Sequence, residues 1–154
     1  MTIDKKVAED KFDDFLMIMD DQLDWLDNET DKYKVTLDLT PDDLSKLERL
    51  FDLMSENQDK EFISKLLITF ARHLGEVVCR NYGGKWNLPF DDEKNVNFNT
   101  PVIIEHTPID GLEFAPLSVM RAYALHRKEG TLQLAVDAQI DPKPLDLSGL
   151  IETE

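Results

Sequence analysis

Apolar residues recur every three or four positions in the first half of the chain, which is the spacing of one face of an α-helix. The first run extends from Phe12 to Leu26, with aspartates between its apolar positions. It predicts an amphipathic helix with an acidic outer face, followed by a polar loop at 27–34. The apolar face consists of Phe12, Phe15, Leu16, Met19, Leu23 and Leu26.

Two more helices are predicted before residue 85. Thr40-Pro41-Asp42-Asp43 is typical of a helix start. The Thr40 side chain can accept from the free amide of Asp43, proline suits the first turn, and acids face the positive end of the helix dipole. The third helix is expected to end at Gly83-Gly84, because glycine adopts the left-handed cap conformation without steric cost. The apolar faces are Leu44, Leu47, Phe51 and Met54, then Phe62, Leu66, Phe70, Leu74 and Val77 or Val78.

The second half contains extended segments. Residues 85–90 and 101–105 are predicted to be extended, and the second of them is rich in β-branched residues. Asp110-Gly111 is a turn signal that indicates a hairpin tip between 102–106 and 112–114. These segments predict a small antiparallel sheet.

Helical and ambiguous segments follow the predicted sheet. Pro116 is expected to open a helix that runs to about Lys128 and closes at Gly130. Residues 131–140 fit either a strand or a helix. Leu132, Leu134 and Val136 alternate as in a strand, whereas Leu132, Val136 and Ile140 suit a helix.

Together these elements predict an α+β fold. A helical N-terminal half of three helices packs on a small antiparallel sheet, with one or two further helices. A length of 154 residues predicts one domain, 1–154. Residues 1–10 and 142–154 are predicted to be flexible tails.

The charge is strongly one-sided. The chain has 32 Asp and Glu against 17 Lys and Arg, a formal net charge of −15. Residues 1–60 carry 18 of the acids and 8 of the bases. Such a field repels nucleic acid and anionic membranes and attracts basic protein surfaces. We therefore expect a basic protein partner, with no nucleic acid and no membrane.

Cysteine usage and the N-terminal sequence bear on the compartment. The single cysteine, Cys79, cannot form an internal disulfide, which fits a reducing environment. No apolar signal core follows Met1, and no apolar run approaches the ~20 residues of a membrane span. The expected location is the cytoplasm, and the chain is expected to be a monomer or a homodimer.

The paired aspartates are the candidate partner-binding residues. Their spacing suits a surface that imitates phosphates, and Trp25 beside them is a candidate aromatic anchor. A solubilising outer face is the alternative interpretation of the same residues. The candidate residues are Asp13, Asp14, Asp20, Asp21, Asp24, Trp25, Asp42 and Asp43.

His73 and Glu76 are the one pair with a spacing that suits a metal ligand set. On a helix they share a face, but a di-metal carboxylate site or a zinc site needs further ligands that the sequence does not supply. An ion-pair ladder of Glu76 with Arg72 and Arg80 is the structural alternative. We therefore predict no catalytic residue, no metal and no cofactor.

Two residues of the same predicted helix suggest packing roles. A glycine inside a helix costs roughly 1 kcal/mol relative to alanine, so Gly75 is expected to allow close approach of another segment, such as the strand that holds Trp86. Cys79 lies in an apolar stretch and is expected to be a buried, unreactive thiol.

The middle third of the chain, about residues 74–119, resembles a family. Its motifs are Leu74-Gly75-Glu76, Gly83-Gly84-x-Trp86, Pro101-Val102, Gly111 and Pro116-Leu117-x-Val119. This order is similar to small bacterial α+β proteins of unknown function, some of which act beside secreted toxins as immunity proteins. The resemblance implies a cytosolic antidote that binds one cognate toxin, and it carries over no catalytic residue.

The expected function is therefore a non-enzymatic protein-binding module, most concretely an immunity protein that neutralises a basic toxin. Three alternatives remain open from the sequence. They are a small enzyme or metal-binding protein that uses His73 and Glu76, a DNA-mimic inhibitor, and a homodimeric adaptor.

Overall fold

The computed structural model describes residues 4–140, and its fold is α+β. The described residues form six α-helices, one 3-10 turn (Asp31–Tyr33) and a two-stranded antiparallel sheet. The helical N-terminal half and the small sheet confirm the predicted fold class. The helices are α1 (Lys5–Met17), α2 (Met19–Thr30), α3 (Asp43–Ser55), α4 (Lys60–Tyr82), α5 (Pro116–His126) and α6 (Thr131–Ile140).

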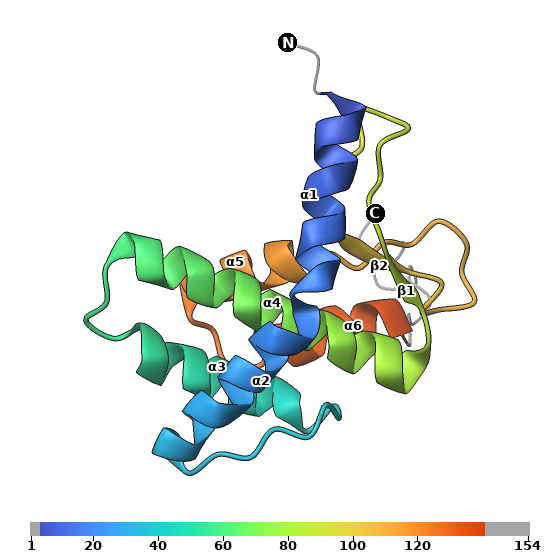
Figure 1. The fold of residues 1–154 in the computed structure, drawn as a ribbon. Helices are drawn as coiled ribbons and strands as arrows, with labels where there is room; N and C mark the ends of the chain where they lie inside the picture. The colour runs from blue at the N-terminus through green and yellow to red at the C-terminus, as the bar shows by residue number, and fades with distance from the viewer. Residues whose placement is uncertain (1–3, 141–154) are drawn as a thin grey trace, which may run out of the picture.

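The prediction of one helix over 12–26 is wrong, because the chain bends at Ile18 between α1 and α2 (Figure 1). The Phe15 carbonyl at this bend accepts from Nε of Arg72 at 3.3 Å. The Arg72 guanidinium also lies 4.3 Å from the centre of the Phe15 ring. A cation from α4 therefore stabilises the carboxyl end of α1, where helix dipoles favour positive charge.

Both ends of this helical pair extend further than the sequence predicts. Residues 5–10, predicted as part of a flexible tail, are helical, because the Asp4 carboxylate accepts from the amides of Lys6 and Val7. The predicted loop at 27–34 is wrong for its first half. Buried Leu26 and Thr30 continue α2, and Lys34 ends the 3-10 turn in the left-handed conformation. The predicted tail at 142–154 lies outside the described residues.

Helices α3 and α4 form an antiparallel hairpin that carries most of the core (Figure 1). The rings of Phe51 and Phe70 meet edge to face with centroids 5.4 Å apart, and both side chains are fully buried. Helix α4 ends at Tyr82 and is followed by Gly83 with a φ of 80°, which confirms the predicted glycine end.

The sheet pairs β1 (Lys85–Asn87) with β2 (Val102–Ile104), and Trp86 lies opposite Ile103. The predicted hairpin after β2 is reduced to one bridge between Ile103 and Phe114. Figure 1 shows the long connection between β1 and β2 running beside α1.

The ambiguous segment 131–140 is the helix α6, and α5 ends at Arg127 in the left-handed conformation rather than at Gly130. The Glu48 carboxylate of α3 accepts from the amides of Gly130 at 2.9 Å and Leu132 at 3.0 Å. These amides belong to the start of α6, where helix N–H groups have no partner within the helix. A side chain from a distant helix therefore caps α6.

Gly75 is in close contact with the strand that holds Trp86, as the sequence predicts, but the approaching group is the indole ring. A Cβ at position 75 would lie 2.2 Å from Cζ2 of Trp86. The same indole donates from Nε1 to Glu76 at 3.0 Å and contacts the Phe15 ring at 5.0 Å between centroids. The indole thus links α1 and α4 to the sheet.

Within residues 4–140, none of the helices combines the length and the apolar character that a membrane crossing requires.

Candidate functional site

The predicted acidic residues do not form one continuous cluster. Asp13 of α1 lines a hollow shared with the 87–91 segment, and Asp14 is exposed on the same helix. The aspartates of α2 are all exposed. They form one side of the helix, because Asp20, Asp21 and Asp27 each lie three or four residues from Asp24. Asp21 also precedes Trp25 by one turn.

The sequence predicts that Asp43 binds a partner, and this prediction is wrong because its side chain is fully buried. Its carboxylate accepts from the amides of Asp38 at 3.1 Å and Leu39 at 2.8 Å. It also lies 2.7 Å from Nε2 of His73. The neighbouring Asp42 is exposed. Two adjacent acids therefore have opposite roles, one in the interior and one on the surface.

The predicted helix start is also displaced. Helix α3 begins at Asp43, after a turn in which the Asp43 amide donates to the backbone carbonyl of Thr40 at 2.9 Å. The Thr40 hydroxyl bonds to the Asp38 carboxylate at 2.6 Å and caps no helical amide. The side chains of Asp38 and Thr40 bind each other and that of Asp43 binds His73, so none of these three caps α3.

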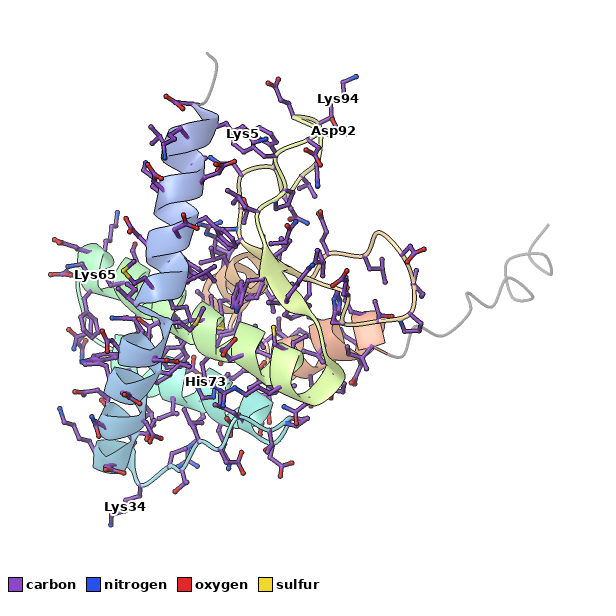
Figure 2. The ribbon with its side chains drawn as sticks, turned by 45° about the vertical axis from the view of Figure 1, so that its right-hand side comes forward. Lys5, Lys34, Lys65, His73, Asp92 and Lys94 are labelled. Carbon is purple, nitrogen blue, oxygen red and sulfur yellow. The ribbon has the colours of Figure 1, made fainter. Side chains whose placement is uncertain are left out.

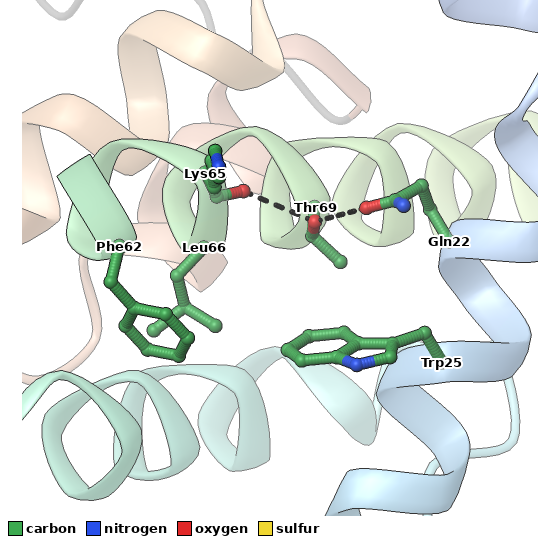
Figure 3. A pocket seen from close by; sticks show the side chains of 6 residues that line it. All are labelled: Gln22, Trp25, Phe62, Lys65, Leu66 and Thr69. Atoms are coloured by element: carbon green, nitrogen blue, oxygen red, sulfur yellow. Dashed lines mark hydrogen bonds between the residues drawn. The ribbon is translucent and has the colours of Figure 1, made fainter.

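Trp25 lies in a shallow groove between α2 and α4 (Figure 3). The indole is 37% exposed and shares the groove with Phe62 and Leu66 of α4. The Thr69 hydroxyl, 2.6 Å from the Gln22 amide oxygen, closes one end. The groove has a volume of about 190 Å³. We call it the Trp25 groove, and its lining residues are Gln22, Trp25, Phe62, Lys65, Leu66 and Thr69.

A second hollow lies on the opposite side of α2, where Asp24 and Asp27 meet the 37–39 segment and His73. The pKa of Asp38 there is lowered, first by the hydrogen bond from the Thr40 hydroxyl and, to a smaller extent, by the charge of Lys46. The volume of this second hollow is also about 190 Å³. We call it the acidic pocket, and its lining residues are Leu23, Asp24, Asp27, Leu37, Asp38, Leu39 and His73.

His73 and Glu76 are not brought together. His73 is a residue of α4, and it is 4% exposed. Its side chain lies between α4 and α3, beside α2, and is bonded to Asp43 (Figure 2). Glu76 instead accepts from the Trp86 indole and lies 3.5 Å from Arg80. No group of three or more His, Cys, Asp or Glu side chains in the described part of the chain is arranged to hold a metal ion.

Burial raises the pKa of the Cys79 thiol to about 12, and the nearby charge of Glu76 adds to the effect. The thiolate is the nucleophile, so at pH 8 only a very small fraction of Cys79 is reactive. We expect iodoacetamide to alkylate Cys79 at pH 8 on the order of 10³-fold more slowly than free cysteine. Mass spectrometry of timed samples measures the rate. Alkylation at the rate of free cysteine would contradict a partly buried, protonated thiol.

Three polar residues of the acidic pocket are not among the predicted partner-binding residues: Asp27, Asp38 and His73. Asp27 follows Asp20 and Asp24 at helical spacing, so it could have been found by extending the predicted helix. Asp38 lies on an irregular segment. No spacing rule connects it to α2, and tertiary contacts alone bring it to the pocket.

Comparison of the chain with family models, with curated proteins and with solved structures found no match. The resemblance carried by residues 74–119 therefore stays a prediction.

Proposed function

We propose that this protein is a non-enzymatic binding module that holds a basic partner protein on the surface of α2. The observation that carries the proposal is an exposed aromatic groove between α2 and α4 that lies beside the free carboxylates of α2. Met19–Thr30 contains five acidic residues and no Lys or Arg. Among the ion pairs within residues 4–140, only Glu29 of this helix takes part, with Lys32 at 2.9 Å. The other four carboxylates are free to meet a partner's cations.

The Trp25 groove would supply the apolar part of such an interface. Tryptophan is enriched among the residues that dominate binding energy, and these residues lie in pockets surrounded by polar contacts. Trp25 is partly exposed, lies beside Phe62 and has Asp21 one turn away. Charges at the edge of an interface mainly accelerate encounter, whereas the buried aromatic slows dissociation. The carboxylates of α2 would thus speed association with the partner, and the Trp25 groove would slow its dissociation.

The most concrete form of this proposal is an immunity protein that neutralises a basic toxin in the cytoplasm. A DNA-mimic inhibitor shares the same chemistry and differs in its partner. The separation of His73 from Glu76 gives no support to an enzyme built on that pair.

The test uses the full chain as bait in an extract of its native cells. Asp20→Asn/Asp21→Asn/Asp24→Asn removes three charges from α2. Asp91→Asn/Glu93→Gln/Asp110→Asn is the matched control, since it removes three exposed charges from the loops. We expect the α2 variant to bind the captured basic protein at least about tenfold more weakly, mainly through slower association, and the control to bind as wild type. Surface plasmon resonance at roughly 50 mM and 500 mM NaCl measures both rates.

Trp25→Ala is expected to accelerate dissociation, with a loss of affinity of about thirtyfold, as for an interface hot spot. Equal affinity of all variants, or an acidic captured protein, would contradict the proposal. A homodimer in sedimentation that Trp25→Ala dissociates would favour the homodimeric adaptor instead.

A further inference from the structure

An open apolar hollow lies where α1, α4 and α5 meet the connection between β1 and β2. Its helical walls are Ala8, Phe12 and Phe15 of α1, Ile68 of α4 and Leu117 of α5. We call it the α1–α5 pocket. Its volume is about 240 Å³, and it shares no lining residue with the Trp25 groove. Since an apolar cavity of about 150 Å³ can hold benzene, the α1–α5 pocket has room for a larger apolar group.

The walls of the α1–α5 pocket are held in place by contacts with the rest of the fold. On α1, the Phe15 ring meets the Trp86 indole edge to face, with 5.0 Å between centroids. On the other side, the backbone amide of Asn99 donates to the Pro89 carbonyl at 2.7 Å and folds the β1–β2 connection back on itself. Binding sites for small molecules are usually preformed and mostly apolar in this way. The residues that the connection adds to the lining are Leu88, Asn99 and Pro101.

Both charged residues that line the α1–α5 pocket are cations, although acids outnumber bases by 32 to 17 in the chain. They are Lys11 of α1 and Arg121 of α5, and neither forms an ion pair within residues 4–140. The Arg72 guanidinium, 4.3 Å from the centre of the Phe15 ring, adds a third positive charge. Arg72 is 6% exposed and also lacks an ion pair in this part of the chain. The pocket therefore combines an apolar surface with uncompensated positive charge.

The shape of the apolar surface favours a linear ligand. Ala8 and Phe15 lie two turns apart on α1, so this wall extends about 10 Å along the helix axis. Lys11 lies between them in the sequence, and Leu117 precedes Arg121 by one turn on α5. A linear chain can thus follow the wall while one end stays within reach of both cations.

We propose that the α1–α5 pocket binds an alkyl carboxylate of medium chain length, with the chain along α1 and the carboxylate between Lys11 and Arg121. The guanidinium fork of Arg121 can donate two parallel N–H bonds to a carboxylate. Contact with Phe12 and Leu117 removes the chain from water. A singly charged head is favoured over a phosphate, because the net charge of −15 repels anions at a distance. No residue of α2 lines this pocket, so the ligand binds without the basic partner.

The test titrates the full chain, isotope-labelled at its isoleucine and leucine methyl groups, with sodium octanoate and follows the methyl signals by NMR. We expect saturable shifts at Ile68 and Leu117, with a dissociation constant on the order of 1 mM. The methyl groups of Leu134, which is 70% exposed on α6, are expected not to shift. Octan-1-ol has the same chain without the charge and is expected to bind at least about fivefold more weakly.

A pair of double variants separates the local cations from the overall charge. Lys11→Gln/Arg121→Gln is expected to weaken octanoate binding about tenfold, because charge-assisted hydrogen bonds are lost. The same variant is expected to leave the binding of octan-1-ol unchanged. Arg49→Gln/Lys60→Gln is the matched control, since it removes one exposed arginine from α3 and one exposed lysine from α4. The control variant is expected to bind octanoate as wild type does.

Linear, non-saturating shifts at Ile68 and Leu117 would overturn the proposal. Equal weakening by the two double variants would also overturn it, as would binding of octan-1-ol or octyl phosphate as tight as that of octanoate. Tighter binding of an acetylated leucyl-leucyl-glutamate amide at the same methyl groups would assign the pocket to an acidic protein segment and would remove the small-molecule ligand.

Discussion

Replacing Asp43 by alanine is expected to lower the free energy of unfolding by about 3–5 kcal/mol, whereas Asp42→Ala is expected to lower it by less than about 1 kcal/mol. Both changes remove one carboxylate from adjacent positions at the start of α3. Asp42 is exposed, and its side chain caps no amide. The comparison therefore separates the burial of Asp43 from the loss of charge.

The large effect follows from the groups left behind. The Asp43 carboxylate accepts from two backbone amides and from His73, which come from the 38–39 segment and from α4. Each buried donor without a partner costs about 1–3 kcal/mol. The contact with His73 is buried on both sides, since Asp43 is fully buried and His73 is 4% exposed. Removal of the carboxylate is thus expected to loosen the acidic pocket as well as to destabilise the fold.

Urea denaturation followed by circular dichroism measures the difference between the two variants. Asp43→Asn keeps the size of the side chain and is expected to cost about 2 kcal/mol, so it serves if the alanine variant is too unstable to purify. Equal stability of Asp42→Ala and Asp43→Ala would show that the buried network contributes nothing.

Gly75→Ala is expected to destabilise the protein by about 2 kcal/mol, the opposite sign to its effect on an isolated helix. A methyl group at position 75 would lie 2.2 Å from Cζ2 of Trp86, so the indole must move. The movement would break the bond from the indole to Glu76 and the contact with Phe15. These losses exceed the gain in helix propensity of roughly 1 kcal/mol.

A double-mutant cycle with Trp86→Leu tests the cause. When the indole is absent, Gly75→Ala is expected to be neutral or to stabilise by up to about 1 kcal/mol. Ser64→Ala, at an exposed position of the same helix, is the control and is expected to change stability by less than about 0.5 kcal/mol. Equal destabilisation by Gly75→Ala in both backgrounds would show that another contact requires the glycine.

Only part of the candidate site could be predicted from the sequence. The exposed aspartates of α2 and the position of Trp25 follow from helical spacing, because that helix has one buried side. Asp43 looks the same as Asp42 in the sequence. Its contacts with His73, thirty positions away, and with the amides of Asp38 and Leu39 distinguish it. Asp38 joins the acidic pocket from an irregular segment for which no periodic pattern exists.

The sequence by itself determined the α+β class, the core faces of α3 and α4, the glycine end of α4 and the extended segments of the sheet. Each depends on a local preference, either apolar residues at a regular spacing or the conformational freedom of glycine. Tertiary structure decided the bend at Ile18, the helical state of 131–140 and the burial of Asp43. In each case a distant polar side chain satisfies the local backbone or carboxylate: Arg72 binds Phe15, Glu48 caps α6 and His73 pairs with Asp43. Such contacts depend on which segments meet in space, and a local sequence pattern does not predict them.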